Sequence, residues 1–228
     1  MKKLVIAMVL ICAGAAIAGP IYDLQTGGYA LDAEVVVDGA IVTGVRYNGV
    51  YISEDVAGPY TGVWVYTGSD PGVSTGDLVD VKGLYKEYYD LTEIDVAVDP
   101  TGYLNYVGPF EGTLVPAAIT TATFSANPEA YEGCFISLLG LMTVTNPDMG
   151  YGEWEAVDMT DGEYMIFDDY WYDPAGISLG DCFCCAVGVI HYGFGAYKLE
   201  PFEGSICFMP CPVANEGMSF GQVKALYR

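Results

Sequence analysis

Cysteines are the most reactive side chains in this sequence. Apart from Cys12, all of them fall in the second half of the chain: Cys134, Cys182, Cys184, Cys185, Cys207 and Cys211. Thiolates bind zinc, but an oxidising compartment favours disulfides over thiolate ligands. An even number of cysteines is typical of a disulfide framework. We therefore predict that these six cysteines form disulfides and hold no metal.

Strand geometry restricts how they can pair. Successive side chains of a β-strand point to opposite faces, so Cys182 and Cys184 share one face and Cys185 takes the other. We expect Cys185 or Cys134 to bond within its own domain. The two cysteines nearest the C-terminus are then expected to fasten the end of the chain to the strand that begins at Cys182.

Carboxylates form the second reactive group. Five of them lie in or beside loops of the second half of the chain: Asp158, Asp161, Asp168, Asp169 and Asp173. Calcium prefers clustered oxygen ligands, so these residues are the candidates for a calcium site. None of them belongs to a twelve-residue EF-hand loop. The alternative is a solvated acidic surface, and no other cofactor is expected.

Nucleophilic catalysis has little support. His191 is the only histidine, so a Ser-His-Asp or Cys-His site would have to use it. The pattern G-x-S-x-G occurs at 72–76, 176–180 and 217–221, but none of these stretches directly follows an expected strand, whereas the serine of a nucleophile elbow lies on a strand-to-helix turn. We expect a half-buried, hydrogen-bonded structural histidine and predict that the protein is not an enzyme.

The N-terminus and the net charge indicate an exported protein. Two lysines precede the apolar run 4–15 and the small residues Ala16-Ile17-Ala18, which is the pattern of a cleavable secretory signal. The run is too short to span a membrane. With 30 acidic and 8 basic residues, the net charge is −22, which repels phosphate backbones. We expect a secreted protein at or beyond the cell surface, or in a periplasm.

Short β-type runs broken by Gly, Asp, Asn and Pro dominate the rest of the chain. The expected strands cover 34–47, 50–54, 61–67, 77–88 and 91–98, then 134–145, 153–159, 164–168, 182–192 and 196–202. Gly76-Asp77 recurs as Gly180-Asp181, and Gly83 recurs as Gly188. Two copies of a roughly 100-residue unit explain this spacing.

These landmarks divide the chain into five parts. We predict a signal peptide at 1–18, a first domain at 19–113, a linker at 114–131 and a second domain at 132–206. The tail 207–228 is expected to be tethered by disulfides and to end in a short helix over 219–227, with Ser219 as its N-cap.

Three motifs in the first copy resemble a known family. They read V-Y-I-S-E-D at 50–55, T-G-V-W-V-Y at 61–66 and G-D-L-V-D-V-K-G at 76–83, followed by a similar connector around 116–133. These motifs resemble those of OB-like domains in exported bacterial proteins, including domains that lie beside extracellular nucleases. The resemblance implies an all-β fold of two tandem five-stranded Greek-key barrels. In those proteins the nuclease chemistry lies in a separate domain.

Aromatic residues occupy the places where OB-folds bind ligands, namely strands 2 and 3 and the loops 1-2 and 4-5. These residues are Tyr47, Tyr51, Trp64, Tyr66, Tyr88 and Tyr89. Exposed aromatics there would stack on sugar rings or bases. The alternative is that they cover the core of half-buried strands. Only Arg46, Lys82 and Lys86 are basic in this copy, so a glycan or a protein partner fits better than nucleic acid.

The sequence therefore favours a secreted, non-catalytic binding or interaction module with an unidentified ligand and no membrane span. One alternative is a structural subunit that self-associates into an extracellular fibre or surface layer, because open barrel edges can pair by strand addition. The other alternative is an accessory binder of single-stranded nucleic acid.

Overall fold

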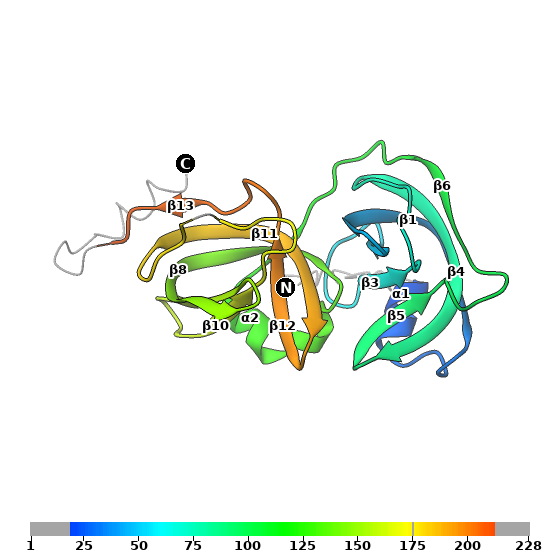
Figure 1. The fold of residues 1–228 in the computed structure, drawn as a ribbon, viewed down its shortest axis with the longest axis horizontal. Coiled ribbons are helices and arrows are strands. Elements are labelled where there is room, and N and C mark those ends of the chain that lie inside the picture. The colour runs from blue at the N-terminus through cyan, green and yellow to red at the C-terminus, as the bar shows by residue number, and fades with distance from the viewer. Residues whose placement is uncertain (1–18, 175, 213–228) are drawn as a thin grey trace, which may run out of the picture.

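The computed structural model describes residues 19–174 and 176–212, so the predicted signal peptide and C-terminal helix lie outside the described residues. The fold is all-β and consists of two sheets that lie side by side (Figure 1). No helix in the described part of the chain is long and apolar enough to cross a membrane.

The first sheet is a closed ring of five strands. Its elements are α1 (Pro20–Gln25), β1 (Glu34–Arg46), β2 (Gly49–Ser53), β3 (Gly62–Tyr66), β4 (Asp77–Tyr88), β5 (Leu91–Asp95) and β6 (Tyr103–Pro109). The strands pair in the order β1-β2-β3-β5-β4, and β4 pairs again with β1 to close the ring. Strand β6 pairs with the first half of β4, on the edge opposite β1. Strands β3 and β5 run parallel, and the other pairs are antiparallel.

Alternating side chains build the core of this ring. Val63 and Val65 point inward, as the sequence pattern predicts, and pack with the inward residues of the other four strands. Helix α1 closes one end, where Ile21 and Leu24 join the same cluster. Each fully buried aliphatic side chain stabilises the fold by about 1.5–3 kcal/mol relative to the exposed state.

The second sheet repeats the same pairing order. Its elements are β7 (Ala117–Ile119), α2 (Thr121–Ala126), the 3-10 helix η1 (Pro128–Tyr131), β8 (Phe135–Gly150), β9 (Glu153–Asp158), β10 (Tyr164–Phe167), β11 (Cys182–Gly193), β12 (Ala196–Pro201) and β13 (Phe208–Met209). Strands pair in the order β8-β9-β10-β12-β11, and β11 pairs with β8. Strands β7 and β13 add at the edges. The core is aromatic, with Trp154 stacked on Phe167 at a ring distance of 4.0 Å.

The two glycines that mark the predicted repeat have the same structural role. A Cβ on Gly83 would lie 2.7 Å from the carbonyl oxygen of Asp95, and a Cβ on Gly188 would lie 2.0 Å from that of Glu200. In each ring the long fourth strand therefore passes so close to the last strand that only glycine fits. The repeat seen in the sequence reflects this shared close approach.

Several elements differ from the expectation. Helix α1, strand β6 and strand β13 were not expected, and the predicted linker contains β7, α2 and η1. Helix α2 begins after Thr120, whose side chain accepts a hydrogen bond from the amide of Thr123 and so caps the helix. The residues 114–131 are thus part of the second sheet and its cover.

Four of the six cysteines form disulfides, which join Cys182 to Cys211 and Cys185 to Cys207. Both tail cysteines fasten the chain end to β11, as predicted. Within the described residues, Cys134 and Cys184 are free thiols, so the prediction that all six are bridged is wrong for these two.

Candidate binding cleft between the barrels

The aromatic face of the first barrel lies against the second barrel. Tyr51 of β2, Trp64 of β3 and Leu91 of β5 form one buried cluster with Phe135 of β8 and Val189 of β11. The surface that the sequence offers as a ligand face is therefore largely an interface within the chain. Because the cluster is contiguous across both barrels, it fixes how they sit together.

Tyr51 is the centre of this interface. Its side chain has no exposed surface, so the expectation that it contacts a ligand is wrong. Its hydroxyl forms a hydrogen bond of 2.6 Å with Nδ1 of His191. Burial raises the pKa of Tyr51 and lowers the pKa of His191 to about 3, so both groups are neutral at physiological pH. His191 is half-buried and hydrogen-bonded, as predicted for a structural histidine.

An ion pair between Arg46 and Glu200 also joins the barrels. The guanidinium of Arg46 lies 3.9 Å from the ring centre of Tyr170, and the indole NH of Trp171 donates to the carbonyl oxygen of Val45 at 2.7 Å. Burial raises the pKa of Glu200 to about 7 although Arg46 opposes this rise. Arg46 and Glu200 therefore form a buried ion pair, in which the loss of either residue would leave the other one buried without its partner.

Glu132 makes a further contact across the interface. Its carboxylate accepts a hydrogen bond of 2.8 Å from the amide of Thr92 in β5, and its other oxygen is buried with no partner among the described residues. Burial raises the pKa of this carboxyl to about 8. Glu132 is thus held protonated over most of the physiological range.

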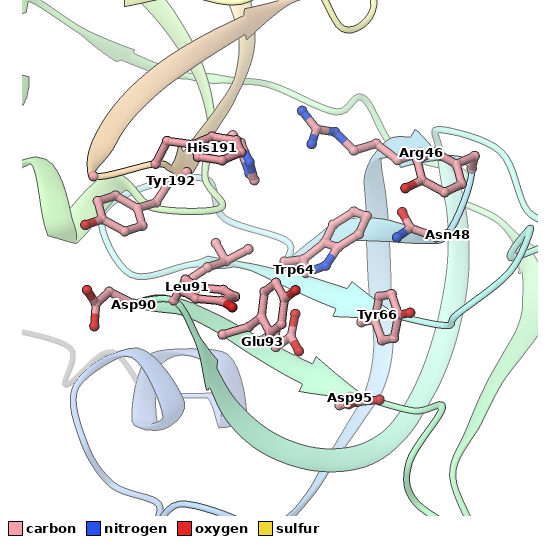
Figure 2. A pocket seen from close by; sticks show the side chains of 16 residues that line it. Arg46, Asn48, Trp64, Tyr66, Asp90, Leu91, Glu93, Asp95, His191 and Tyr192 are labelled. Atoms are coloured by element: carbon pink, nitrogen blue, oxygen red, sulfur yellow. The ribbon is translucent and has the colours of Figure 1, made fainter.

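Beside this interface the two barrels leave an open cleft of about 1010 Å³ (Figure 2). Aromatic residues dominate its lining: Tyr47, Trp64, Tyr66, Tyr88, Tyr89, Tyr192 and Phe194. Five of the six aromatic residues predicted from the sequence therefore lie in one place, although Trp64 is mostly buried and exposes only 6% of its surface. Tyr51 lies behind the cleft, within the interface.

Two tight turns carry Phe194 and Tyr89, the two most exposed aromatic residues of the cleft. Tyr88 and Tyr89 lie at the β4–β5 turn with their rings edge to face at 4.8 Å, and Phe194 lies at the equivalent β11–β12 turn. Tyr89 and Phe194 both have positive φ, at 49° and 54°, a conformation that is unusual for bulky residues. Large apolar side chains held outward on strained turns are characteristic of binding surfaces.

Carboxylates complete the lining. Glu93 is the register partner of Trp64 and Asp95 that of Tyr66, so these acids lie beside the aromatic rings on the outer face of the first barrel. Asp90 adds a third carboxylate at the turn. Figure 2 shows Glu93 and Asp95 on β5 next to the rings of β3.

Glu93 differs from the other acids in its surroundings. It exposes only 5% of its surface, yet it has no hydrogen bond or ion pair within the described part of the chain. Its cross-strand neighbour Lys86 is paired with Asp32 instead. Burial and the nearby Asp95 raise the pKa of Glu93 to about 7. The carboxylate oxygens of Glu93 are not among the fully enclosed, unpartnered atoms of the described residues, so they reach the cleft, where a bound cation would offset their partial desolvation.

The predicted calcium ligands do not come together. Asp158 and Asp161 both accept from the hydroxyl of Thr121, at 3.3–3.4 Å, whereas Asp168 lies 3.4 Å from the ammonium of Lys198. In the described ranges, no three of these carboxylates lie within coordinating distance. The geometry offers no shared site for the five aspartates.

Two comparisons with known sequences found no relative of this chain. No protein-family model matches the sequence, and a search of curated proteins finds no significant match. The function has to be inferred from the geometry of the cleft.

The acids of the cleft were missed from the sequence, although a signal was present. Glu93 and Asp95 alternate with Thr92 and Ile94, which places both carboxylates on one face of the strand. The residues contributed by the second barrel had no such signal, because only the folded chain brings Tyr192 and Phe194 to the first barrel.

Proposed function

We propose that this protein is a secreted, non-catalytic binding module whose ligand site is the cleft between two OB-like barrels. We propose further that the cleft receives a positively charged side chain, lysine or arginine, from a protein partner. The pairing order 1-2-3-5-4 in both rings supports the OB-like assignment. The two disulfides support export, because such bonds persist in oxidising compartments.

The single observation that carries the proposal is Glu93. Its side chain is 5% exposed beside its register partner Trp64, its carboxylate lacks a partner among the described residues, and it borders an open cleft. A cation entering the cleft would meet aromatic faces first and carboxylates below them. Cation–π contacts contribute about 0.5–2 kcal/mol each, and a hydrogen bond to a charged group contributes about 1.5–3 kcal/mol.

Charge also selects among ligand classes. The cleft has three carboxylates, and its basic lining residue, Arg46, is already paired with Glu200. The whole chain has a net charge of −22. This field attracts cations and repels the phosphates of nucleic acid, which makes the nucleic-acid alternative the weaker one.

The histidine of the cleft supports binding rather than catalysis. His191 is hydrogen-bonded to Tyr51, and its pKa of about 3 makes it a poor proton acceptor. A general base needs a pKa near the working pH.

Calorimetric titration with end-blocked tetrapeptides tests the proposal. One peptide carries a single lysine, a second carries arginine, and a third carries norleucine, which keeps the hydrocarbon chain without the ammonium. We expect the lysine and arginine peptides to bind and the norleucine peptide not to bind. Glu93→Gln should weaken binding by roughly tenfold to a hundredfold, because a charged partner is lost. The matched control is Glu111→Gln, which alters an exposed acid outside the cleft and should leave binding unchanged.

The pH dependence provides a second readout. Because the pKa of Glu93 is about 7, its charged form increases between pH 6 and pH 8, and the affinity for the lysine peptide should increase with it. A neutral oligosaccharide that binds tightly, without any effect of pH or of Glu93→Gln, would contradict the cationic ligand. Tight binding of a thymidine oligonucleotide at low salt would instead favour the nucleic-acid alternative.

Self-assembly into a fibre or layer remains a separate prediction from the sequence. Sedimentation velocity on the purified chain tests it, since a strict monomer at high concentration would contradict a structural subunit.

A further inference from the structure

A second reactive site lies at the far end of the second barrel from the cleft. The Sγ atoms of Cys184, Cys185 and Cys207 all lie within 4.8 Å of one another. Cys185 and Cys207 are joined in a disulfide, whereas Cys184 is a free, half-buried thiol. The cluster is therefore a thiol held against a disulfide.

A β-bulge explains why three sulfur atoms meet. In a regular strand, Cys184 and Cys185 would point to opposite faces. Backbone hydrogen bonds join Cys207 of the tail to both Cys184 and Cys185, so two residues of β11 lie opposite one residue of the tail and form a bulge. A bulge re-aims side chains locally, so both neighbours reach the same partner. The expectation that Cys185 takes the opposite face from Cys184 is wrong for this reason.

Backbone contacts hold Cys207 beside both neighbours. The amide of Cys184 donates to the carbonyl oxygen of Cys207 at 3.1 Å, and the amide of Cys207 donates to the carbonyl oxygen of Cys185 at 2.9 Å. The thiol of Cys184 also points to the carbonyl oxygen of Cys207, at 3.7 Å. Cys207 therefore lies within reach of both adjacent cysteines.

We infer that these three residues form a thiol–disulfide exchange site, at which the bond moves between Cys185–Cys207 and Cys184–Cys207. The thiolate of Cys184 attacks Sγ of Cys207, a new S–S bond forms, and the old bond breaks with its electron pair on Cys185. The proton lost by Cys184 is taken up at Cys185, so no oxidant or reductant is consumed.

Exchange would always leave one free thiol in this cluster while the tail stays fastened. The second disulfide, Cys182–Cys211, uses the other end of the tail segment and holds it near β11 during the step. The exposed position of Cys207 also makes the site accessible to low-molecular-weight thiols, which would speed the exchange by the same chemistry. The inference is independent of the ligand cleft.

Cysteine variants with peptide mapping test the inference. The chain is unfolded in acid, free thiols are alkylated, and tandem mass spectrometry assigns labelled and bridged cysteines. In Cys185→Ser we expect Cys184 to bond with Cys207 and to lose its label. In Cys184→Ser the original bond should remain. Cys134→Ser is the matched control, because it removes a buried thiol outside the cluster.

The wild-type chain provides a readout that does not depend on folding of a variant. After incubation with a low concentration of glutathione, we expect label at both Cys184 and Cys185 and two bridged forms of Cys207. Label confined to Cys184 after prolonged incubation would overturn the inference. Alkylation of both Cys184 and Cys207 in the Cys185→Ser chain, with Cys182–Cys211 intact, would also overturn it.

Discussion

Replacing Glu132 by glutamine should stabilise the protein in alkaline solution and have little effect in acid. Glu132 is 1% exposed, and its carboxylate has one hydrogen bond, from the amide of Thr92. Glutamine keeps the accepting oxygen and removes the charge. The variant therefore isolates the cost of ionising this carboxyl inside the interface between the barrels.

The size of the effect follows from the pKa. Burial raises the pKa of Glu132 from 4.5 to about 8, so the folded chain keeps the proton over a range in which the unfolded chain has lost it. Stability conferred by this proton is complete below the unfolded pKa and is lost as the pH rises towards the folded pKa. At about 1.4 kcal/mol per pH unit, the loss between pH 5 and pH 9 is about 4 kcal/mol.

Urea unfolding at pH 5 and pH 9 measures this difference. The stability of Glu132→Gln relative to the wild type should rise by about 4 kcal/mol between the two pH values. Glu93 and Glu200 titrate in both chains, so their contributions cancel in the comparison. Glu111→Gln is the control, because Glu111 is exposed and its replacement should shift stability equally at both pH values. A stability difference for Glu132→Gln that does not change with pH would refute the reasoning.

Two further predictions concern the contacts between the barrels. Arg46→Met should destabilise the chain by about 3–5 kcal/mol, because it leaves the buried carboxylate of Glu200 unpaired. The double variant with Glu200→Gln should recover part of this loss. Equal losses in the single and double variants, measured by urea unfolding, would contradict a coupled pair. Tyr51→Phe should cost about 1–3 kcal/mol, because Nδ1 of His191 loses its hydrogen bond in a buried place. Tyr47→Phe, at the exposed rim of the cleft, is the control. If Tyr51→Phe shifts the urea midpoint of unfolding no more than Tyr47→Phe does, the hydrogen bond to His191 does not stabilise the fold.

The strands of both rings were predictable from the sequence because each ring depends on local alternation. Val63 and Val65 alternate with Trp64 and Tyr66, and the structure places the valines inside and the aromatics outside. The repeat of Gly83 as Gly188 was also visible in the sequence, because a side chain at either position would clash with the backbone of the neighbouring strand.

The partner of an outward face was not predictable in this way. Alternation shows that Tyr51 and Trp64 leave the core of their own barrel, but it carries no information about what covers them. Their cover comes from residues far along the chain in the second barrel, such as Phe135 and His191. The bulge at Cys184 could not be predicted for a related reason. A single extra residue turns the next side chain to the other face of the strand, and the composition of the strand does not show it.

The buried cluster around Tyr51 limits how far this chain can be treated as two interchangeable units. Either barrel alone would expose a wide apolar face that includes Leu91 or Phe135, and such faces promote aggregation. Gene fusion or truncation at the boundary between the repeats would therefore separate halves that depend on each other for solubility. The two barrels are therefore expected to stay soluble only when they are joined in one chain.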